Sequence, residues 1–434
     1  MKRPLAAPLV AALLALSACR PPAADPGRDP ADLPVPAPPA APSPVAPATG
    51  VARPAPRGRF LLAGRALLDL TTLEKKPLPD DTLVATLAGG LLIVARGSTL
   101  RALDPETGAE LWSSPIVKEI GLPEALVANG ERLFVLGNPR HLAIHELATG
   151  KRIHDEPLVD TGGLAAPHEP RVNDRGLAFL LGDTGAFFAQ NNGPATTLNR
   201  LPEPQGASHM RATTLSVTEA GACVQYWAPK TWQALRCFDA RGYVTWDRPW
   251  VEERFFLAQG SPRHLLLTTQ GHLHDDAPRT LVLSAESGAV EFDQPRASGA
   301  LLEDAGGAID LVLSGEPRRI AAYGRDGTLR WEVPYPFRGL VTAARSEDGL
   351  VLLAHPLVPD ATLRELRVVH VDAAGRARWT TAVPIVNGVE HAVGAVSLRV
   401  VRDRVIVQAR SARGGPLMAS VLSLAEGKLL ASLP

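Results

Sequence analysis

An excess of charge of either sign is absent from this sequence of 434 residues. Lys and Arg together number 45, as do Asp and Glu, so the formal net charge is zero. Nucleic-acid-binding domains usually carry a basic bias, and this balance argues against nucleic acid as a partner. The sequence also lacks sustained helical periodicity, and beyond its N-terminus it has no apolar stretch of membrane-spanning length. We therefore expect a protein built from strands.

Motifs that mark common enzyme classes are missing as well. There is no His-Glu-x-x-His zinc motif, no Gly-x-Ser-x-Gly elbow and no glycine loop of the kind that cradles phosphate. The three cysteines, Cys19, Cys223 and Cys237, include no adjacent pair. We assign no catalytic, cofactor-binding or metal-binding residue, and we predict that the chain is not an enzyme.

The sequence contains a repeated motif. Its clearest copy is Leu100–Trp112, which reads LRALDPETGAELW. A short apolar strand leads into an Asp, a tight turn closes on a glycine, and a second strand follows. The equivalent turn glycines are spaced 39 to 52 residues apart, at Gly108, Gly150, Gly193, Gly242, Gly288, Gly327, Gly375 and Gly427. Strand-and-turn repeats of this period predict a β-propeller with one copy per blade.

Tryptophan recurs at one position of the repeat. Four of the seven tryptophans follow a turn glycine by four residues, namely Trp112, Trp246, Trp331 and Trp379. A Trp that recurs once per blade has the apolar area and the indole N–H to pack between neighbouring blades. We therefore predict that these four side chains stabilise the ring and do not form a ligand site.

The number of copies sets the expected size of the ring. We predict that residues 58–434 form an all-β, eight-bladed propeller of four-stranded antiparallel blades. A further partial copy begins at Ala66, has Leu73 at the turn position, and lacks an inner strand. The strands between Phe60 and Leu70 either complete a blade begun at the C-terminus or form an abbreviated edge.

The repeat resembles that of the quinoprotein-like (PQQ-like) propeller family. Ala102, Asp104, Gly108 and Trp112 match the family's Ala-x-Asp-x-x-x-Gly-x-x-x-Trp line position for position. The resemblance covers Arg59–Pro434 and implies the fold, but both enzymes and non-catalytic scaffolds carry this motif. The quinone enzymes hold calcium and use adjacent cysteines beside the cofactor, and this sequence has no such pair. We therefore expect no cofactor.

The N-terminus has the pattern of an export signal. Lys2 and Arg3 precede an apolar run from Leu5 to Leu16, which is too short to span a membrane as a mature helix. The run ends in Leu-Ser-Ala-Cys19, which resembles the lipobox of bacterial lipoproteins. This resemblance implies a signal peptide over residues 1–18, cleavage before Cys19 and lipidation of its sulfur, with palmitate among the acyl chains. Arg20, in place of Asp, is compatible with sorting to the outer membrane.

The segment after the lipobox has a different composition. Thirteen of the 38 residues from Arg20 to Arg57 are proline, and few are large and apolar. Such a segment cannot bury a core and favours extended polyproline conformations. We predict that residues 19–57 comprise the lipidated cysteine and a disordered linker.

Export from the cytoplasm would place the two remaining cysteines in a compartment that permits disulfides. Cys223 and Cys237 are symmetric about residue 230, near which the chain is expected to turn as a hairpin. We predict a cross-strand disulfide between them; two buried free thiols are the alternative.

One polar cluster is a weak candidate for a metal site. His272 and His274 alternate beside Asp275 and Asp276, with His264 nearby. Alternating side chains on a strand point the same way and can bind a metal together with Asp. Since the segment lies between two strand-like runs, a polar hairpin loop is the simpler interpretation.

Two hypotheses for function follow. The first is a non-catalytic, membrane-tethered interaction scaffold in the bacterial cell envelope, anchored in the outer membrane and facing the periplasm. In its lipobox, propeller fold and lack of a cofactor site, the chain resembles the propeller lipoproteins of the machinery that assembles outer-membrane β-barrels. That resemblance implies envelope proteins, including barrel-assembly components, as partners. The second hypothesis is an envelope enzyme, or a receptor for a small molecule, carbohydrate or metal, that uses the propeller channel.

Overall fold

The computed structural model describes residues 58–433 with gaps. The predicted signal peptide and linker, residues 1–57, lie outside the described residues. The internal segments that are also outside are 117, 139–140, 159–166, 182–184, 199–210, 229–231, 251–254, 270–278, 296–298, 305–308, 316–318, 325–326, 336, 357–364, 385–395 and 411–415.

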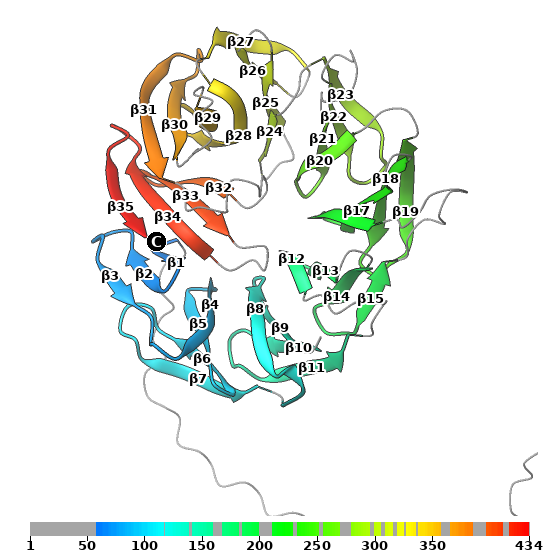
Figure 1. The fold of residues 1–434 in the computed structure, drawn as a ribbon, viewed down its shortest axis with the longest axis vertical. Coiled ribbons are helices and arrows are strands. Elements are labelled where there is room, and N and C mark those ends of the chain that lie inside the picture. Colours follow the sequence, from blue (N-terminus) through cyan, green and yellow to red (C-terminus); the bar gives the residue numbers. More distant parts are fainter. Residues whose placement is uncertain are drawn as a thin grey trace, which may run out of the picture. The chain divides into compact units, whose positions relative to one another are not determined.

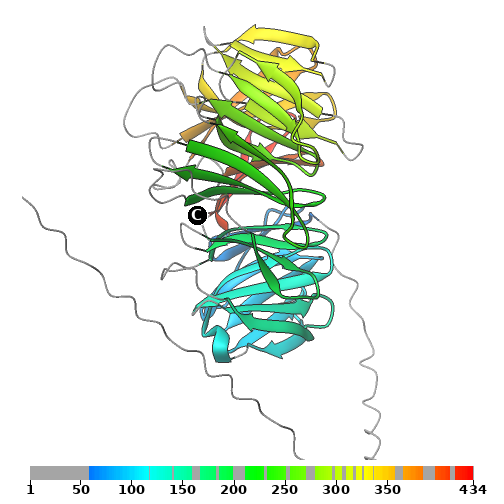
Figure 2. The ribbon, with the colours of Figure 1, turned by 90° about the vertical axis from the view of Figure 1, so that its right-hand side faces the viewer.

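Nine antiparallel sheets form a ring (Figure 1). Eight of the sheets have four strands, and consecutive strands of the chain lie side by side in each of them. We number the blades along the chain, so that β1–β3 form blade 1, β4–β7 form blade 2, and β32–β35 form blade 9. Seen from the side, the blades lie one beside another in a single layer (Figure 2).

The four strands of each complete blade run from the centre of the ring to its rim. The inner strands are β4 (Thr82–Ala88), β8 (Leu122–Ala128), β12 (Pro167–Asn173), β16 (Arg211–Val217), β20 (Phe255–Gly260), β24 (Gly299–Glu303), β28 (Phe337–Ser346) and β32 (Val396–Val401). The second strands are β5 (Leu91–Arg96), β9 (Arg132–Asn138), β13 (Gly176–Leu181), β17 (Gly221–Ala228), β21 (His264–Thr269), β25 (Ile309–Gly315), β29 (Gly349–Pro356) and β33 (Arg404–Arg410). The third strands are β6 (Thr99–Leu103), β10 (His141–Glu146), β14 (Gly185–Gln190), β18 (Trp232–Asp239), β22 (Thr280–Ser284), β26 (Arg319–Tyr323), β30 (Glu365–Asp372) and β34 (Pro416–Ser423). The outer strands are β7 (Glu110–Pro115), β11 (Arg152–Pro157), β15 (Ala195–Leu198), β19 (Val244–Trp250), β23 (Val290–Gln294), β27 (Leu329–Pro334), β31 (Ala377–Pro384) and β35 (Leu429–Leu433).

Blade 1 has three strands, β1 (Phe60–Ala63), β2 (Ala66–Asp69) and β3 (Lys75–Pro77). Four-stranded antiparallel blades are as predicted, but the ring has nine blades, so the prediction of eight is wrong. The partial copy at Ala66 is not an edge of another sheet. It folds as a blade without an inner strand, because each of its two apolar faces packs on an adjacent blade.

The two faces of blade 1 pack on different blades. Leu61 and Leu68 lie in one buried cluster with Ile406 and Val421 of blade 9. Leu62 and Leu67 lie in another cluster with residues of blade 2, including Val94. β35 pairs with β34 alone, so the ring closes through side-chain packing and not through a shared sheet.

The turn that defines the repeat is held by a short carboxylate and a glycine. In blade 2, Asp104 Oδ1 accepts the backbone N–H groups of Glu106 and Thr107, each at 2.8 Å. Burial acts to raise the pKa of Asp104, but these two hydrogen bonds outweigh it and the pKa is lowered. Gly108 closes the turn with a φ of 75°, which glycine adopts without steric cost. In blade 1, Leu73 occupies the same position with a φ of 62°.

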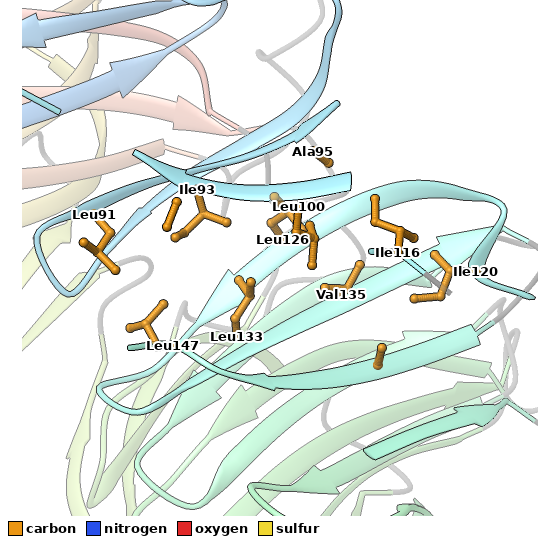
Figure 3. Packing of buried hydrophobic residues seen from close by; sticks show 12 residues of the cluster. Leu91, Ile93, Ala95, Leu100, Ile116, Ile120, Leu126, Leu133, Val135 and Leu147 are labelled. Atoms are coloured by element: carbon orange, nitrogen blue, oxygen red, sulfur yellow. The ribbon is translucent and has the colours of Figure 1, made fainter. Parts of the chain in front are cut away.

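Buried aliphatic side chains from facing sheets fill the space between blades. Figure 3 shows the cluster between blades 2 and 3, where Ile93 and Leu100 of blade 2 meet Leu126 and Leu133 of blade 3. η1 (Lys118–Ile120), the short 3₁₀ turn between these blades, adds the fully buried Ile120. Burial of such side chains stabilises a fold by about 1.5–3 kcal/mol each.

The repeated tryptophans contact the turn of the next blade. The Trp112 ring of blade 2 packs on Gly150 of blade 3, and its Nε1 donates to the carbonyl of Leu147 at 3.1 Å. Trp246 donates in the same way to Ala285, and Trp379 donates to Leu424. The rings of Trp246, Trp331 and Trp379 lie against Gly288, Gly375 and Gly427. All four side chains are partly buried, and none is fully buried.

Space for a side chain is absent where a tryptophan covers the turn. A Cβ atom on Gly150 would lie 2.4 Å from Trp112 Cε3, and one on Gly427 would lie 2.4 Å from Trp379 Cε3. A Cβ atom on Gly108 would meet no heavy atom within 4 Å, because blade 1 has no tryptophan to cover it. The same turn therefore occurs with and without its covering ring.

Cys223 and Cys237 lie directly opposite each other on β17 and β18, with Cα atoms 4.0 Å apart, and are joined by a disulfide. Both are buried in a cluster with Phe255 and Leu265 of blade 6. In the part of the chain that the structure describes, no helix is long and apolar enough to cross a membrane.

Replacement of Gly150 by Ala should destabilise the protein more than replacement of Gly108. Both turns have positive φ, so each substitution carries a backbone cost of about 1–2 kcal/mol. Gly150→Ala adds the overlap with Trp112, which we expect to cost a further 1–3 kcal/mol or so. Chemical unfolding of both variants measures the difference. Equal losses of stability would show that the Trp ring moves away freely and does not hold the blades.

Loss of the disulfide should lower the melting temperature. Its loop spans 14 residues, for which loop closure predicts a stabilisation of about 3 kcal/mol. The double variant Cys223→Ala/Cys237→Ala should melt lower than the wild type and respond no further to a reducing agent. A wild-type protein whose melting is the same with and without reductant would contradict this expectation.

Candidate functional site

The inner strands surround the centre of the ring, and each runs in the same direction because every complete blade has the same strand order (Figure 1). The inner strands therefore begin on one face of the ring, where the chain passes from blade to blade. We call this the connection face. The repeated turns, with their glycines, lie on the opposite face, which we call the turn face.

Irregular pairing occurs near both faces of the ring. The register shifts between the inner and second strands in six blades, at Thr82/Val84, Pro123/Ala125, His168/Arg171, Ala212/Thr214, Leu257/Gln259 and Phe337/Gly339. It also shifts between the third and outer strands of seven blades, beside the repeated turns. Bulges re-aim side chains, but here they favour neither face.

Three exposed leucines lie at the connection face around blade 1. Leu83 is the second residue of β4, Leu122 the first residue of β8, and Leu417 the second residue of β34. Their exposed fractions are 50%, 64% and 40%. They come from blades 2 and 9, which flank blade 1, and from blade 3, which follows blade 2, and they present apolar area to solvent.

Three exposed arginines belong to blades 4 and 9. Arg171 lies on β12, Arg399 on β32 and Arg410 at the end of β33. Burial lowers the pKa of Arg410, and the charges of Arg399 and Arg171 lower it further.

These arginines are exposed to water and yet surrounded by protein. All three side chains have substantial exposed area, whereas burial lowers the pKa of both Arg399 and Arg410.

The three arginines differ from other arginines of the ring in their partners. Carboxylates raise the pKa of Arg59, Arg96 and Arg263. Among the described residues, no carboxylate forms an ion pair with Arg171, Arg399 or Arg410. Arg399 Nη2 donates a hydrogen bond of 3.3 Å to Gln408 Oε1, and Gln408 Nε2 donates one of 2.7 Å to the carbonyl of Leu62. Gln408 therefore orients Arg399 and joins blade 9 to the inner edge of blade 1.

A Ser–His–Asp group in blade 8 does not have the geometry of a catalytic triad. His370 Nε2 lies 3.1 Å from Ser346 Oγ and 3.2 Å from Asp348 Oδ1. In a triad the acid orients one ring nitrogen while the other takes the proton of the serine, and here both partners share one nitrogen. His370 is also buried beside Trp379, and burial lowers its pKa. The group packs blade 8 at its border with blade 9.

The residues of the weak metal candidate are not brought together by the described structure. His272, His274, Asp275 and Asp276 lie outside the described residues. His264 is buried, with Nδ1 2.9 Å from Glu303 of blade 7 and Nε2 3.2 Å from Glu291. It thus joins two blades. Across the described ranges there is no group of three or more His, Cys, Asp or Glu arranged to hold a metal ion.

The structure places the predicted site residues that it describes away from the centre of the ring. The four tryptophans are on outer strands, and the disulfide is inside blade 5; Cys19 falls outside the described residues. The sequence analysis did not single out Arg171, Arg399 and Arg410, because they occupy unrelated positions of the repeat. Isolated arginines on strands carry no spacing from which their surroundings could be predicted.

The buried histidines predict a loss of stability on mild acidification. Burial lowers the pKa of His145 and of His370 below the ordinary value of 6.5. The unfolded chain then binds protons first, so this stability is complete above about pH 6.5 and is lost as the pH falls through the folded pKa. The free energy of unfolding should decrease from pH 7 to pH 5, and His145→Gln should reduce that slope. An unchanged slope in the variant would contradict the assignment.

Comparison with known proteins identifies the family. Residues 69–205 and 233–433 match the model of the family described as outer membrane protein assembly factor BamB. Solved structures of similar fold include a eukaryotic initiation factor, with 13% identity, coverage of 85% of this chain and 93% of that chain, and a TM-score of 0.50. BamB from Moraxella catarrhalis has 12% identity, 74% and 92% coverage and a TM-score of 0.37. The dihydro-heme d1 dehydrogenase NirN has 13% identity, 85% and 76% coverage and a TM-score of 0.44.

These structural similarities concern the fold alone. A comparison with curated proteins found no match. The family match, by contrast, extends over most of the ring, from blade 1 to blade 9. This chain therefore belongs to the family of β-propeller proteins described as outer membrane protein assembly factor BamB.

Proposed function

We propose that this protein is a non-catalytic interaction scaffold of the bacterial cell envelope, tethered to the outer membrane by lipid on Cys19. Its role is in outer-membrane protein assembly, and its partners are subunits of the β-barrel assembly machinery. The observation that carries this proposal is the family match over residues 69–205 and 233–433. A match within one family supports a shared kind of role, although a propeller fold alone does not specify function.

The N-terminal sequence supports the tether. A charged start, a short apolar run and the Leu-Ser-Ala-Cys19 ending fit a lipoprotein signal. Each buried CH₂ of an acyl chain contributes about 0.8 kcal/mol, so several chains on one residue anchor a protein durably. The proline-rich residues up to Arg57 then separate the ring from its anchor.

The described structure supports a surface role for the ring. Its polar clusters are used in packing: His264 with Glu303 joins two blades, and His370 with Asp348 lies within blade 8. Leu83, Leu122 and Leu417 instead expose apolar area on the connection face. Exposed apolar groups with a polar rim are typical of protein-binding surfaces.

Capture of the full lipoprotein from detergent-solubilised membranes tests the proposal. Barrel-assembly subunits should be recovered with the wild type, as measured by quantitative mass spectrometry. The variant Leu122→Asp should recover at least tenfold less, because it places a charge in the apolar contact. Leu329→Asp is the matched control, since Leu329 is also about half exposed (51%) but lies at the turn face of blade 7. It should recover as much as the wild type.

Two outcomes would contradict the proposal. If the wild type recovers no barrel-assembly subunit under conditions that keep that machinery intact, the role in assembly is wrong. If Cys19→Ala remains membrane-bound and is labelled by a fatty-acid probe, the lipid anchor is wrong. Equal loss of capture by Leu122→Asp and Leu329→Asp would place the contact elsewhere than on the connection face.

A further inference from the structure

Blade 1 has an open edge where the other eight blades have an inner strand. β1 pairs with β2 alone, and the hydrogen bond from the Leu70 N–H to the carbonyl of Arg59 fixes which backbone groups face β2. Because these groups alternate along a strand, the N–H and C=O groups of Phe60 and Leu62 point to the other side, where the inner strand is missing. Leu62 is only 4% exposed, yet among the described residues its N–H has no hydrogen-bond partner. Buried N–H groups are rarely left unpaired.

A glutamine lies at this edge where another blade holds an inner strand. In blade 5, Gln225 Nε2 donates to the carbonyl of Phe255 and Gln225 Oε1 accepts from the N–H of Leu257, both on the inner strand of blade 6. In blade 9, Gln408 lies on the second strand as Gln225 does, but the next blade offers no inner strand. Its Nε2 donates instead to the carbonyl of Leu62 on β1. Gln408 therefore satisfies one carbonyl of the open edge and none of its N–H groups.

The chain enters blade 1 with the geometry of a turn between an inner and a second strand. In blade 9 that turn consists of two residues, Arg402–Asp403, of which only the first has a positive φ. Directly before β1, Gly58 has a φ of 84°, and the φ of Arg59 is not positive. A two-residue hairpin turn with glycine in its first position is the type II′ turn. A strand that is joined to β1 by this turn ends at residue 57.

We propose that residues 53–57, Arg-Pro-Ala-Pro-Arg, pair with β1 and complete blade 1 as its inner strand. A two-residue turn over Gly58–Arg59 places residue 57 opposite Phe60 and Ala55 opposite Leu62. Ala55 and Leu62 then form a hydrogen-bonded pair, in which the N–H of each residue donates to the carbonyl of the other. A carbonyl accepts two hydrogen bonds, so Gln408 keeps its contact with Leu62.

The two prolines of this segment have the phase that an inner strand requires. Pro54 and Pro56 alternate with Ala55 and Arg57, so their missing N–H groups fall on the side away from β1. In the complete blades that the structure describes, the inner strand pairs only with the second strand. Proline occurs on such edge strands because no ladder hydrogen bond is lost there. A residue before a proline also favours extended backbone, as a strand requires.

The position of the segment in the chain favours it over a strand of another molecule. Residues 53–57 are joined to β1 by two residues, so their pairing is intramolecular and takes place at a high effective concentration. A strand from another molecule would lose translational and rotational freedom on binding. With residues 53–57 in blade 1, the free tether ends at residue 52. The proposal concerns the closure of the ring, and it stands whether or not the ring binds barrel-assembly subunits.

Hydrogen exchange of the purified full-length lipoprotein, in detergent, tests the pairing. Ala55→Pro removes the N–H that faces β1, so the amide of Leu62 should exchange at least about tenfold faster than in the wild type. Mass spectrometry of peptides that cover residues 58–63 measures this rate. Two matched controls should protect Leu62 as the wild type does. Pro54→Ala adds an N–H on the side away from β1, and Ala48→Pro adds a proline earlier in the linker.

The melting temperature and the protein concentration separate the remaining outcomes. Ala55→Pro should melt at a lower temperature than the wild type, and both controls should melt as the wild type does. Equal protection of Leu62 in the wild type and in Ala55→Pro would overturn the proposal. Protection that is lost on dilution would assign the open edge to a second copy of the chain. Protection found only in lipoprotein that is captured together with its partners would assign the edge to a partner's strand, and either result would overturn the proposal.

Discussion

The ring depends on the contact between a tryptophan of one blade and the turn glycine of the next. The outer strand of each such blade reaches over its neighbour, so that the indole ring covers the turn, and the N–H of Trp112, Trp246 and Trp379 donates to a carbonyl there. At Gly150 and Gly427 this contact leaves no space for a Cβ atom. Positive φ already favours glycine at these turns, and the covering ring makes it a steric requirement as well. Tryptophan and glycine therefore recur together because they are two halves of one interface.

Blade 1 shows what replaces this contact where the tryptophan is missing. Its outer strand is short, and Lys76 Nζ donates to the carbonyl of Glu106 in the next blade, where an indole ring would otherwise lie. Instead, apolar packing on both faces of β1 and β2 closes the ring. Without an inner strand, the edge of β1 faces the centre of the ring, and the side chain of Gln408 satisfies the carbonyl of Leu62. The oxygen of the same amide accepts a hydrogen bond from Arg399, so blade 1 helps to position this arginine.

Much of the fold could be predicted from the sequence because it is encoded locally and repeated. Asp104, Gly108 and Trp112 each have one role that spacing alone reveals. The number of blades could not be predicted in this way. The segment around Leu73 lacks the glycine and the tryptophan, and whether it is an edge or a blade depends on packing against segments over 300 residues away. The contact of Arg399 was missed for a related reason. Arg399, Gln408 and Leu62 come together only because the ring closes, and nothing near Leu62 in the sequence indicates the other two.

The residues that lie outside the repeat pattern are therefore the informative ones for function. Positions shared by all blades serve the interface between blades, which every propeller needs. Arg399 illustrates a residue outside the pattern. It is held by Gln408, whose amide also donates to the carbonyl of Leu62 in blade 1, so this contact exists only where the blade without an inner strand meets blade 9.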